Sequence, residues 1–560
     1  MSRMGISRLW GKITVLIAVC GLGLSAQAKY DGGSGEPNNP YQISSVADWQ
    51  ELMATPEDWG SHFVLTSDID LNGVSITPIA PDTSTSSGFQ GTQFTGVFDG
   101  NDHVIRNADV HGHYGGLFGY VGENGHIKNL GVEDASIFGQ NYVGGLVGYN
   151  GGTISNCYST ALVGAFDGSY VGGLVGKSDG TISNCYSTAL VGVSKGGSGG
   201  LVGVNGGTIR NSHSAGSAGG YFGGAGGLVA TNSGTIINCY STCSVRDGMT
   251  LLGGLVATNS GNISYCYSAG SAIGGGYCIG GLVARNSGRI SNCYSAAPAG
   301  GGYYVGGLVG ENGGPISNCY STGSVSGGAY YVGGLVGGNG GPISNCYSTG
   351  SVSGGAYYVG GLVGTNSGVI SDCYSTGSVS GESSVGGLLG RNAGEISRCY
   401  AAGPVIADSN AGGLVGASYG AISDCYSTGS VSGGDYVGGL VGDNGGDISI
   451  CYSTGFVGGT GSHLGGLLGW NLGTINACFW DVGTAGEPNS AGGIPKTTAE
   501  MQTKSTFTDV GWDFVEIWLI NEGATYPVLR QEIRSDLNGN AGVDLLDFAI
   551  LADHWLRDVR

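Results

Sequence analysis

Near one end of the 560-residue sequence, oxygen-bearing side chains recur at alternate positions in the stretch DLNGNAGVDLLD. Oxygen ligands at this spacing can surround one Ca²⁺ ion, because the loop turns around the cation. The residues that follow, 548–556, have the pattern of an amphipathic helix. We therefore predict a calcium site with Ca²⁺ as the cofactor. Its expected ligands are Asp536, Asn538, Asn540, the Gly542 carbonyl, Asp544 and Asp547.

This loop and helix resemble one half of a type I dockerin, in which position 12 is commonly Asp rather than Glu. Two residues depart from the pattern: Ala541 replaces the glycine usual at position 6, and Asn540 replaces an acid. Only one such half is present, whereas dockerins usually have two. The resemblance implies a short EF-hand-like segment and makes a cohesin-like module one partner to test. The alternative is an acidic tail that holds no ion.

Charged side chains are sparse in the rest of the chain, but three of them share one register. Asp372 and Asp424 lie two repeats apart, a separation of about 10 Å if the repeats stack as strands, and Arg398 lies between them. Glycosidases and lyases built on parallel β-helices use clustered carboxylates, sometimes with Lys or Arg. The column is therefore either a charged ladder along a corner or a catalytic group.

The other candidates for catalysis or metal binding are isolated. Asp99, Asp102 and His103 cluster in FDGNDH, and His111 and His113 form an H-x-H pair with no further ligand nearby in the sequence. The sequence has no H-E-x-x-H or phosphate-loop motif. We assign no catalytic residue. If the protein is an enzyme, we expect a polysaccharide lyase or a glycoside hydrolase.

The composition excludes several classes of protein. Glycine accounts for 118 residues, yet there is no Gly-X-Y period and there are only 12 prolines, so the chain is not collagen. Aliphatic residues recur at fixed places, which a disordered Gly/Ser linker does not show. The net charge of -20 argues against nucleic-acid binding, which needs clustered Lys and Arg.

The N-terminal residues 1–28 have the pattern of a signal peptide. Basic residues precede an apolar core at 13–24, and AQA at 26–28 is an A-x-A cleavage site. A lipoprotein site at Cys20 is disfavoured, because Val19 stands where a small residue is expected. No later stretch reaches the roughly 18–20 apolar residues of a membrane span. We therefore expect a secreted protein, extracellular or at the cell surface, without a membrane span.

A repeat with the core GGLVG fills most of the chain, and its copies are spaced 26 to 29 residues apart. A unit of this size cannot bury a core alone, so neighbouring units must stack. Each unit contains three short apolar runs separated by Gly, Asn or Ser, which predict strands. The leucine of the core occurs at Leu117, Leu146, Leu174, Leu201, Leu228, Leu255, Leu282, Leu308, Leu335, Leu362, Leu388, Leu414, Leu440 and Leu467.

This period predicts an all-β fold, a parallel β-helix (β-solenoid) of about 14 coils of 26–29 residues. A β-propeller is disfavoured, because its blades need about 40 residues or more and four strands each. The adjacent Leu and Val of GGLVG cannot both face inward from a straight strand. Either the chain bends there, or one aliphatic column is half-exposed.

The repeats resemble GLUG-motif repeats, which are named for the G-L-[any]-G core, and the resemblance covers residues 115–480. The stretch YQISSVADWQELM resembles the lead-in of the same secreted bacterial proteins. The stretch KTTAEMQTKSTFTDVGWDF resembles the closing segment of planctomycete-type members. The resemblance implies a β-solenoid in secreted or surface proteins, including some adhesins and IgA-protease relatives. It implies no activity.

The flanking segments are expected to cap the open ends of the solenoid, whose strand edges would otherwise recruit other chains. Ser45 can N-cap a short helix that buries Trp49 and Leu52. Trp512 and Trp518 offer an apolar lid at the other end, with sugar binding as the alternative role. The expected division is 1–28 signal peptide, 29–114 N-terminal cap and first irregular coils, 115–480 repeat solenoid, 481–534 C-terminal cap and 535–560 dockerin-like segment.

Nearly every repeat has one cysteine, in PISNCYS or a variant of it. In an early coil Leu130 stands where the next copy has Cys157, so the position tolerates burial. Ile and Cys are three residues apart, and both face inward only if the chain bends at the intervening Asn, which tolerates the left-handed region. We predict free, buried thiols, because parallel in-register side chains suit a disulfide poorly. A zinc site in this column is not expected.

The residue after the cysteine, a tyrosine in nearly every copy, then faces outward. Tyrosine rings can stack on sugars or protein, which predicts a binding surface. The alternative is that the rings stack on each other and only stabilise the rod. Paired tyrosines at 303–304, 330–331 and 357–358 add a second aromatic run. The candidate ligand-binding residues are Tyr320, Tyr347, Tyr374, Tyr400, Tyr426 and Tyr452.

We therefore expect a secreted, non-catalytic repeat protein for cell-surface adhesion or for binding an extracellular polymer or carbohydrate. Its expected partner is an extracellular glycan or a surface protein, and its C-terminal segment is expected to bind calcium. The alternative is a component of a polysaccharide-degrading system. That component would be either a β-helix glycosidase or lyase or a dockerin-bearing accessory protein.

Overall fold

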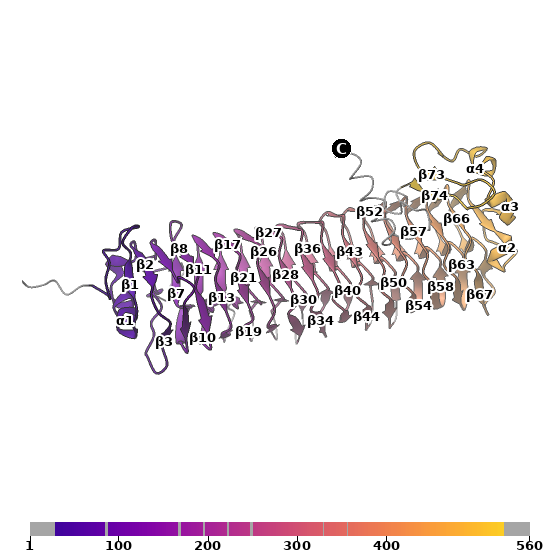
Figure 1. Ribbon diagram of the computed structural model, residues 1–560. Coiled ribbons are helices and arrows are strands. Elements are labelled where there is room, and N and C mark those ends of the chain that lie inside the picture. Colours follow the sequence, from indigo (N-terminus) through magenta and orange to yellow (C-terminus); the bar gives the residue numbers. More distant parts are fainter. Residues whose placement is uncertain are drawn as a thin grey trace, which may run out of the picture.

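The computed structural model describes residues 29–84, 88–165, 170–193, 196–220, 223–246, 250–328, 330–355 and 357–530. Over these residues the chain forms a long rod of stacked β-coils with a cap at each end (Figure 1). The prediction of an all-β parallel β-solenoid is confirmed. The signal peptide predicted at 1–28 and the calcium loop predicted at 536–547 lie outside the described residues.

The coil that starts at Val309 shows the path of the chain. Two of the three apolar runs seen in the sequence are each divided by a bend, so this coil has five short strands rather than three. The run YVGGLVG is divided at Gly334–Leu335, where this coil ends, and the run PISNCYS is divided at Asn318. The strands are β41 (Val309–Asn312), β42 (Ile316–Ser317), β43 (Tyr320–Ser321), β44 (Val325–Gly327) and β45 (Val332–Gly333).

Each strand of this coil pairs in parallel with its counterpart in the next coil, without a shift of register. For example, β41 pairs with the next strand of its sheet so that Val309 lies opposite Val336 and Asn312 opposite Asn339. Within the described residues this sheet has fourteen strands, as many as the GLUG leucines. Besides β41 they are β7 (Phe118–Val121), β11 (Val147–Asn150), β16 (Val175–Ser178), β21 (Val202–Asn205), β26 (Val229–Asn232), β31 (Val256–Asn259), β36 (Val283–Asn286), β46 (Val336–Asn339), β51 (Val363–Asn366), β55 (Leu389–Asn392), β59 (Val415–Ser418), β64 (Val441–Asn444) and β69 (Leu468–Asn471).

The GGLVG core is a bend between two strands, and it buries both of its aliphatic residues. Leu308 and Val309 are both fully buried. The backbone approaches itself closely at this bend: a Cβ on Gly306 would lie 1.9 Å from the Val309 carbonyl oxygen, and one on Gly307 would lie 2.1 Å from the Gly334 carbonyl oxygen. Only glycine fits at these two positions. Of the two alternatives left by the sequence, the bend is the one that the structure contains.

The N-terminal cap is a helix followed by additional coils. Helix α1 (Val46–Ala54) begins with a capping box in which the Ser45 hydroxyl accepts from the Asp48 backbone N–H and the Asp48 carboxylate accepts from the Ser45 N–H. Trp49 and Leu52 are fully buried beneath it, as predicted. The 3-10 helix η1 (Pro56–Asp58) follows. Strands β1 (Tyr41–Ile43), β2 (His62–Leu65) and β4 (Val97–Asp99) extend one sheet of the solenoid beyond β8 (His126–Lys128).

The C-terminal cap packs against the side of the last coils as well as covering their end (Figure 1). Trp512 and Trp518 are buried in it, in one apolar cluster with Phe507. In the described part of the chain, every helix is too short or too polar to cross a membrane. The elements of this cap are α2 (Val482–Ala485), β72 (Ile494–Lys496), α3 (Thr498–Met501), α4 (Ser505–Thr508) and the antiparallel pair β73 (Trp518–Leu519) and β74 (Val528–Leu529).

Candidate binding surfaces

The predicted corner before each cysteine is confirmed. Asn318 has a φ of 54°, and Ile316 and Cys319 on either side of it are both buried. Asparagine is the common residue because its short polar side chain tolerates this region. Across the repeats, φ at this position is 50° to 57° at Asn129, Asn156, Asn184, Asn211, Asn238, Tyr265, Asn292, Asn318, Asn345, Asp372, Arg398, Asp424, Ile450 and Ala477.

The cysteines fill the core. All fourteen cysteines of the described residues are buried and free of disulfides. The Cys319 thiol donates to the Ser317 carbonyl at 3.1 Å, and its sulfur accepts from the Cys293 backbone N–H at 3.4 Å. Burial raises the pKa of the Cys266 thiol well above its ordinary value. Within the residues that the structure describes, no three His, Cys, Asp or Glu side chains are grouped so that they could hold a metal ion.

The tyrosines that follow the cysteines point away from the coil, as predicted, and their rings lie face to face. The Tyr320 and Tyr347 rings have centroids 4.9 Å apart and planes 1° apart. The same stacking continues to Tyr452, with centroids 4.9 to 5.1 Å apart and planes within 8°. The ring faces therefore cover one another, and the ring edges and hydroxyls are what this column presents to a ligand.

Two of the six tyrosines proposed as ligand contacts are covered. Tyr426 and Tyr452 are only 5% and 1% exposed, because the C-terminal cap packs on them. The Trp518 ring lies 6.2 and 6.1 Å from their rings, and the Tyr452 hydroxyl donates to the Pro527 carbonyl. The expectation that both are accessible is wrong. The cap needs an apolar surface for its own aromatic residues, and the column supplies it.

A second aromatic surface lies on the turn that precedes GGLVG, on four successive coils. The surface has an outer column of Tyr277, Tyr303, Tyr330 and Tyr357 and an inner column of Tyr304, Tyr331 and Tyr358. The outer column is partly open, since Tyr277, Tyr330 and Tyr357 are 47%, 36% and 45% exposed. The outer rings stack less regularly than the inner ones, since Tyr303 and Tyr330 are tilted by 40°. We call the set the turn tyrosines: Tyr277, Tyr303, Tyr304, Tyr330, Tyr331, Tyr357 and Tyr358.

Two of the turn tyrosines have a backbone conformation that large side chains seldom adopt. Tyr331 and Tyr358 have φ of 41° and 57°. Such a conformation costs an L-residue of this size about 1–2 kcal/mol. Ser384 and Asn410 hold the same position in the next two coils and are small polar residues that fit turns more easily. The chain therefore places large rings at this turn despite a conformational cost.

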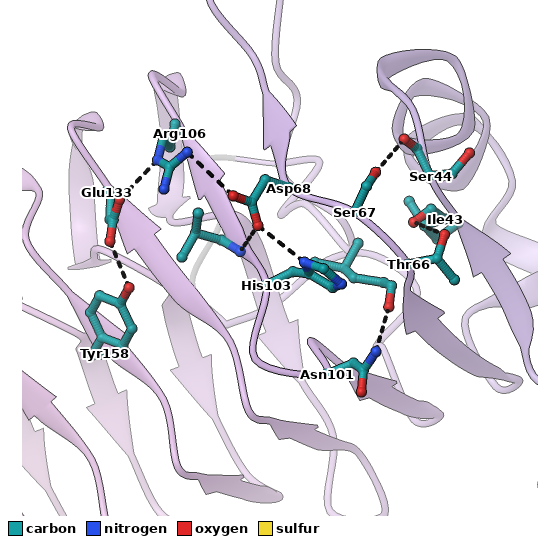
Figure 2. Close-up of polar contacts among 12 residues, drawn as sticks. Ile43, Ser44, Thr66, Ser67, Asp68, Asn101, His103, Arg106, Glu133 and Tyr158 are labelled. Carbon is teal, nitrogen blue, oxygen red and sulfur yellow. Dashed lines mark hydrogen bonds and ion pairs between the residues drawn. The ribbon is translucent and has the colours of Figure 1, made fainter.

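The N-terminal coils carry a polar network that the sequence did not reveal (Figure 2). Asp68 accepts from the Val104 N–H at 3.2 Å, contacts His103 Nδ1 at 3.1 Å and pairs with Arg106 at 3.3 Å. The Val104 hydrogen bond, helped by His103 and Arg106, lowers the pKa of Asp68. Asp99, which is close to His103 in the sequence, pairs with Lys128 at 2.8 Å.

The same network reaches the first ring of the tyrosine column. Arg106 Nε donates to Glu133 at 2.9 Å, and Glu133 accepts from the Tyr158 hydroxyl at 2.6 Å (Figure 2). The Tyr158 hydrogen bond and Arg106 lower the pKa of Glu133. Both carboxylates of the network are thus held ionised as acceptors, which suits a link between coils and is unsuited to donating a proton.

The two carboxylates of the charged column at the corner have different hydrogen-bond partners. Arg398 makes two hydrogen bonds to Asp372, of 2.7 and 2.8 Å. Asp424 accepts from Trp518 Nε1 of the C-terminal cap at 3.3 Å, and burial raises its pKa. One carboxylate is neutralised by an arginine and the other holds the cap. This arrangement supports the charged-ladder alternative for the column.

An internal column of asparagines was missed by the sequence reasoning, although its signal is present. An Asn recurs four residues after the leucine of the GLUG core. In the structure these side chains, except the half-buried Asn471, are buried. They are joined from coil to coil, for example Asn259 to Asn286 at 2.7 Å. Ser178 and Ser418 replace Asn in two coils. The column comprises Asn150, Asn205, Asn232, Asn259, Asn286, Asn312, Asn339, Asn366, Asn392, Asn444 and Asn471.

The repeats match a family model described as the GLUG motif, which confirms that GLUG repeats are present. The matched residues are 139–163, 167–192, 275–297, 301–326, 328–353, 355–380 and 407–432. These matches lie in the solenoid and include all seven turn tyrosines.

Two known proteins are similar to part of the chain. Halomucin of Haloquadratum walsbyi is 34% identical over 147 residues, which cover 24% of this chain and 2% of halomucin. A putative Gly-rich membrane protein of Evansella cellulosilytica is 33% identical over 141 residues, covering 24% of this chain and 16% of that protein. The chain thus matches only a small share of the length of either relative.

One solved structure is also similar to part of the chain. It is a putative immunoglobulin A1 protease from Bacteroides ovatus, 24% identical, with a TM-score of 0.36. The match covers 43% of this chain and 78% of that chain.

Proposed function

We propose that this protein is an extracellular repeat rod that binds a carbohydrate polymer through the turn tyrosines. The observation that carries the proposal is that Tyr331 and Tyr358 keep large rings in a backbone conformation that the smaller Ser384 and Asn410 adopt in the next two coils. A tyrosine, Tyr436, takes the same position and conformation again one coil later. Rings retained at such a cost are expected where they contribute to binding.

The chemistry of the surface favours a neutral, extended ligand. Tyrosine combines an apolar face with a hydroxyl, which suits the alternating C–H and O–H groups of a sugar. The four coils that carry these residues span about 14 Å at roughly 4.8 Å per step, which favours a chain over a single sugar. The nearby Arg285 and Glu311 neutralise each other at 2.8 Å.

The column from Tyr320 to Tyr400 is proposed as an accessory contact. Its rings stack on one another, so its contribution comes from ring edges and hydroxyls rather than from ring faces. Tyr426 and Tyr452 take no part in this surface, because the cap covers them.

A location at the cell surface or outside the cell is part of the proposal. It is supported by the signal-peptide pattern of residues 1–28 and by the name of the Evansella relative, which describes a membrane protein. Adhesion to a glycan or to a surface protein is the role that fits a long, repetitive rod.

Calcium binding by residues 536–547 is proposed from their side-chain types and spacing alone. Calorimetric titration of the full chain with CaCl₂ tests it. Asp536→Ala combined with Asp547→Ala should remove the binding isotherm, whereas equal affinity of the variant and the wild type would contradict the site. A cohesin pull-down with the same two proteins tests the dockerin-like role.

Polymer binding is tested by co-sedimentation with a panel of insoluble polysaccharides. The combined variant Tyr303→Ala, Tyr330→Ala and Tyr357→Ala should bind at least tenfold more weakly. Tyr419→Ala is the matched control, because Tyr419 is also exposed but is not one of the turn tyrosines and has no positive φ. Wild-type failure on every polymer, or equal binding by the triple variant, would refute the proposal. Release of soluble sugar would instead support the polysaccharide-degrading alternative.

A further inference from the structure

The register position that holds the turn tyrosines Tyr304, Tyr331 and Tyr358 recurs in earlier coils, where other tyrosines fill it. The aromatic column at this position is interrupted near the first third of the rod. The column begins with Tyr114, Tyr142 and Tyr170, whose rings follow one another with centroids 5.7 and 6.3 Å apart. The register then places Gly197 and Gly224 in the next two coils. Leu251 and Cys278 come next, and the column resumes at Tyr304.

A cavity of about 230 Å³ lies at this interruption. Sites for drug-sized ligands are usually larger, about 300 to 1,000 Å³, so this cavity is suited to a single ring. Its ends are Tyr170 and Leu251, its floor includes Gly197 and Gly224, and Thr231 and Thr258 line one side.

The solenoid prevents this cavity from closing by collapse. Parallel pairing fixes the coils on both sides: Ser198 pairs with Val171 in the preceding coil and with Ala225 in the following one. The spacing of coils is set by these backbone hydrogen bonds at about 4.8 Å, whatever the side chains are. Removal of two side chains from a rigid column therefore leaves space, whereas a less constrained core would shrink around it.

The lining of the cavity is neutral and partly hydroxylated. Thr231 and Thr258 lie opposite each other in register, one coil apart, so they offer two hydroxyls in a row. The Tyr170 ring forms one wall, and a Cβ on Gly197 would lie 2.9 Å from it, so the ring reaches over that glycine. None of the lining residues is charged.

Among the described residues, the two cations nearest to Thr231 and Thr258 in their register column are already paired. Lys177 lies 3.1 Å from Asp179 and over the Tyr149 ring, and Arg285 lies 2.8 Å from Glu311. Within the part of the chain that the structure describes, these two cations therefore offer no unpaired charge to a charged ligand. A ring with hydroxyl groups and an apolar face would find both hydrogen-bonding partners and an aromatic wall.

We infer that this cavity is a second binding site, specific for a single neutral sugar ring. The ring packs against Tyr170 and exchanges hydrogen bonds with the hydroxyls of Thr231 and Thr258. The site shares no residue with the turn tyrosines and does not depend on polymer binding by them.

The test is saturation-transfer NMR and calorimetry on the full chain, with glucose, galactose, mannose and N-acetylglucosamine as probes and phenol as the aromatic comparison. The double variant Thr231→Val and Thr258→Val keeps the side-chain shape and removes both hydroxyls. It should bind the preferred sugar at least tenfold more weakly. Gly224→Tyr, which restores a ring to the column, should abolish binding.

Thr365→Val is the matched control, because Thr365 occupies the same register far from the cavity, and it should bind like the wild type. Unchanged melting temperatures establish that the valine variants are folded. The site is refuted if no sugar binds the wild type, if phenol alone binds, or if the double variant binds as well as the control. The Tyr303, Tyr330 and Tyr357 alanine variant should retain sugar binding at this cavity. Loss of polymer binding by the turn tyrosines and loss of sugar binding by the cavity can therefore be measured independently.

Discussion

Asn312 donates its side-chain N–H to the Asn339 side-chain carbonyl of the next coil at 2.8 Å, inside the core of the rod. The same amide group donates to the Gly314 backbone carbonyl at 2.8 Å. Asn339 in turn donates to Asn366 at 2.8 Å. Each interior amide therefore depends on both neighbours, so the column couples successive coils and specifies their register.

Loss of one interior amide should cost more than one hydrogen bond. We expect Asn339→Ala to lower the free energy of unfolding by about 2–4 kcal/mol, because it leaves buried partners in two neighbouring coils unsatisfied. Asn339→Ser should cost less, since Ser178 and Ser418 fill this position naturally. Urea unfolding of the full chain measures both. Equal effects of the alanine and serine variants would contradict this account.

The corner position predicts a stabilising substitution. Tyr265 has a φ of 54° and is 62% exposed, so it bears a conformational cost and gains little from packing. Tyr265→Asn should stabilise the protein by roughly 1 kcal/mol. The reciprocal change Asn292→Tyr should destabilise it by a similar amount, since Asn292 has the same conformation. A lower melting temperature for Tyr265→Asn would show that the packing of the Tyr265 ring outweighs the strain of its backbone.

The buried thiols should be unreactive in the native protein. All of these side chains are buried in the core of the rod, so the reagent cannot reach the sulfur atoms in the folded protein. With Ellman's reagent at pH 8, we expect the fourteen cysteines of the described residues to react only after denaturation. Fast stoichiometric labelling of the native protein would place the cysteine column at the surface and refute its position in the core.

Docking of the C-terminal cap should depend on pH through Asp424. Burial raises the pKa of this carboxyl above its unfolded value, so its ionised form disfavours docking at pH 7. That penalty is absent below about pH 4, where the group is neutral in both states, and it appears as the pH rises through the folded pKa.

Asp424→Asn should therefore slow amide exchange in residues 498–529 at pH 7 and flatten its pH dependence. The asparagine carbonyl can still accept from Trp518 Nε1, so the contact itself is preserved. Asp443→Asn is the control, since burial also raises the pKa of Asp443 but the residue lies outside the cap. Faster exchange in Asp424→Asn than in the wild type would mean that the charge favours docking.

The solenoid could be predicted because its contacts repeat with one sequence period. Once the leucines were aligned, every residue had a known neighbour one coil away, and the pattern of Ile, Asn and Cys implied the left-handed corner that Asn318 adopts. Leu130 at the cysteine position indicated burial in the same way. The recurrent Asn of the core was equally visible but was missed, because a polar residue is not expected inside.

Contacts that do not follow the period could not be predicted. Arg106 joins Asp68 to Glu133 across irregular coils, and no spacing in the sequence relates the three residues. Asp99 and His103 are close in the sequence, but folding placed Asp99 beside Lys128 and His103 beside Asp68. The exposure of Tyr452 likewise depends on where a distant segment packs.

The amino-acid sequence by itself determined the coil, its period, and which side chains face inward, because each coil is stacked on a near copy of itself by backbone hydrogen bonds. The tertiary structure decided which outward surfaces remain open. The cap covers Tyr426 and Tyr452 but not the turn tyrosines, and the glycines at 197 and 224 leave a cavity instead of a collapsed turn. The first outcome depends on how the cap, which does not follow the repeat period, packs on the last coils. The second depends on how the side chains around the two glycines fill the space above them.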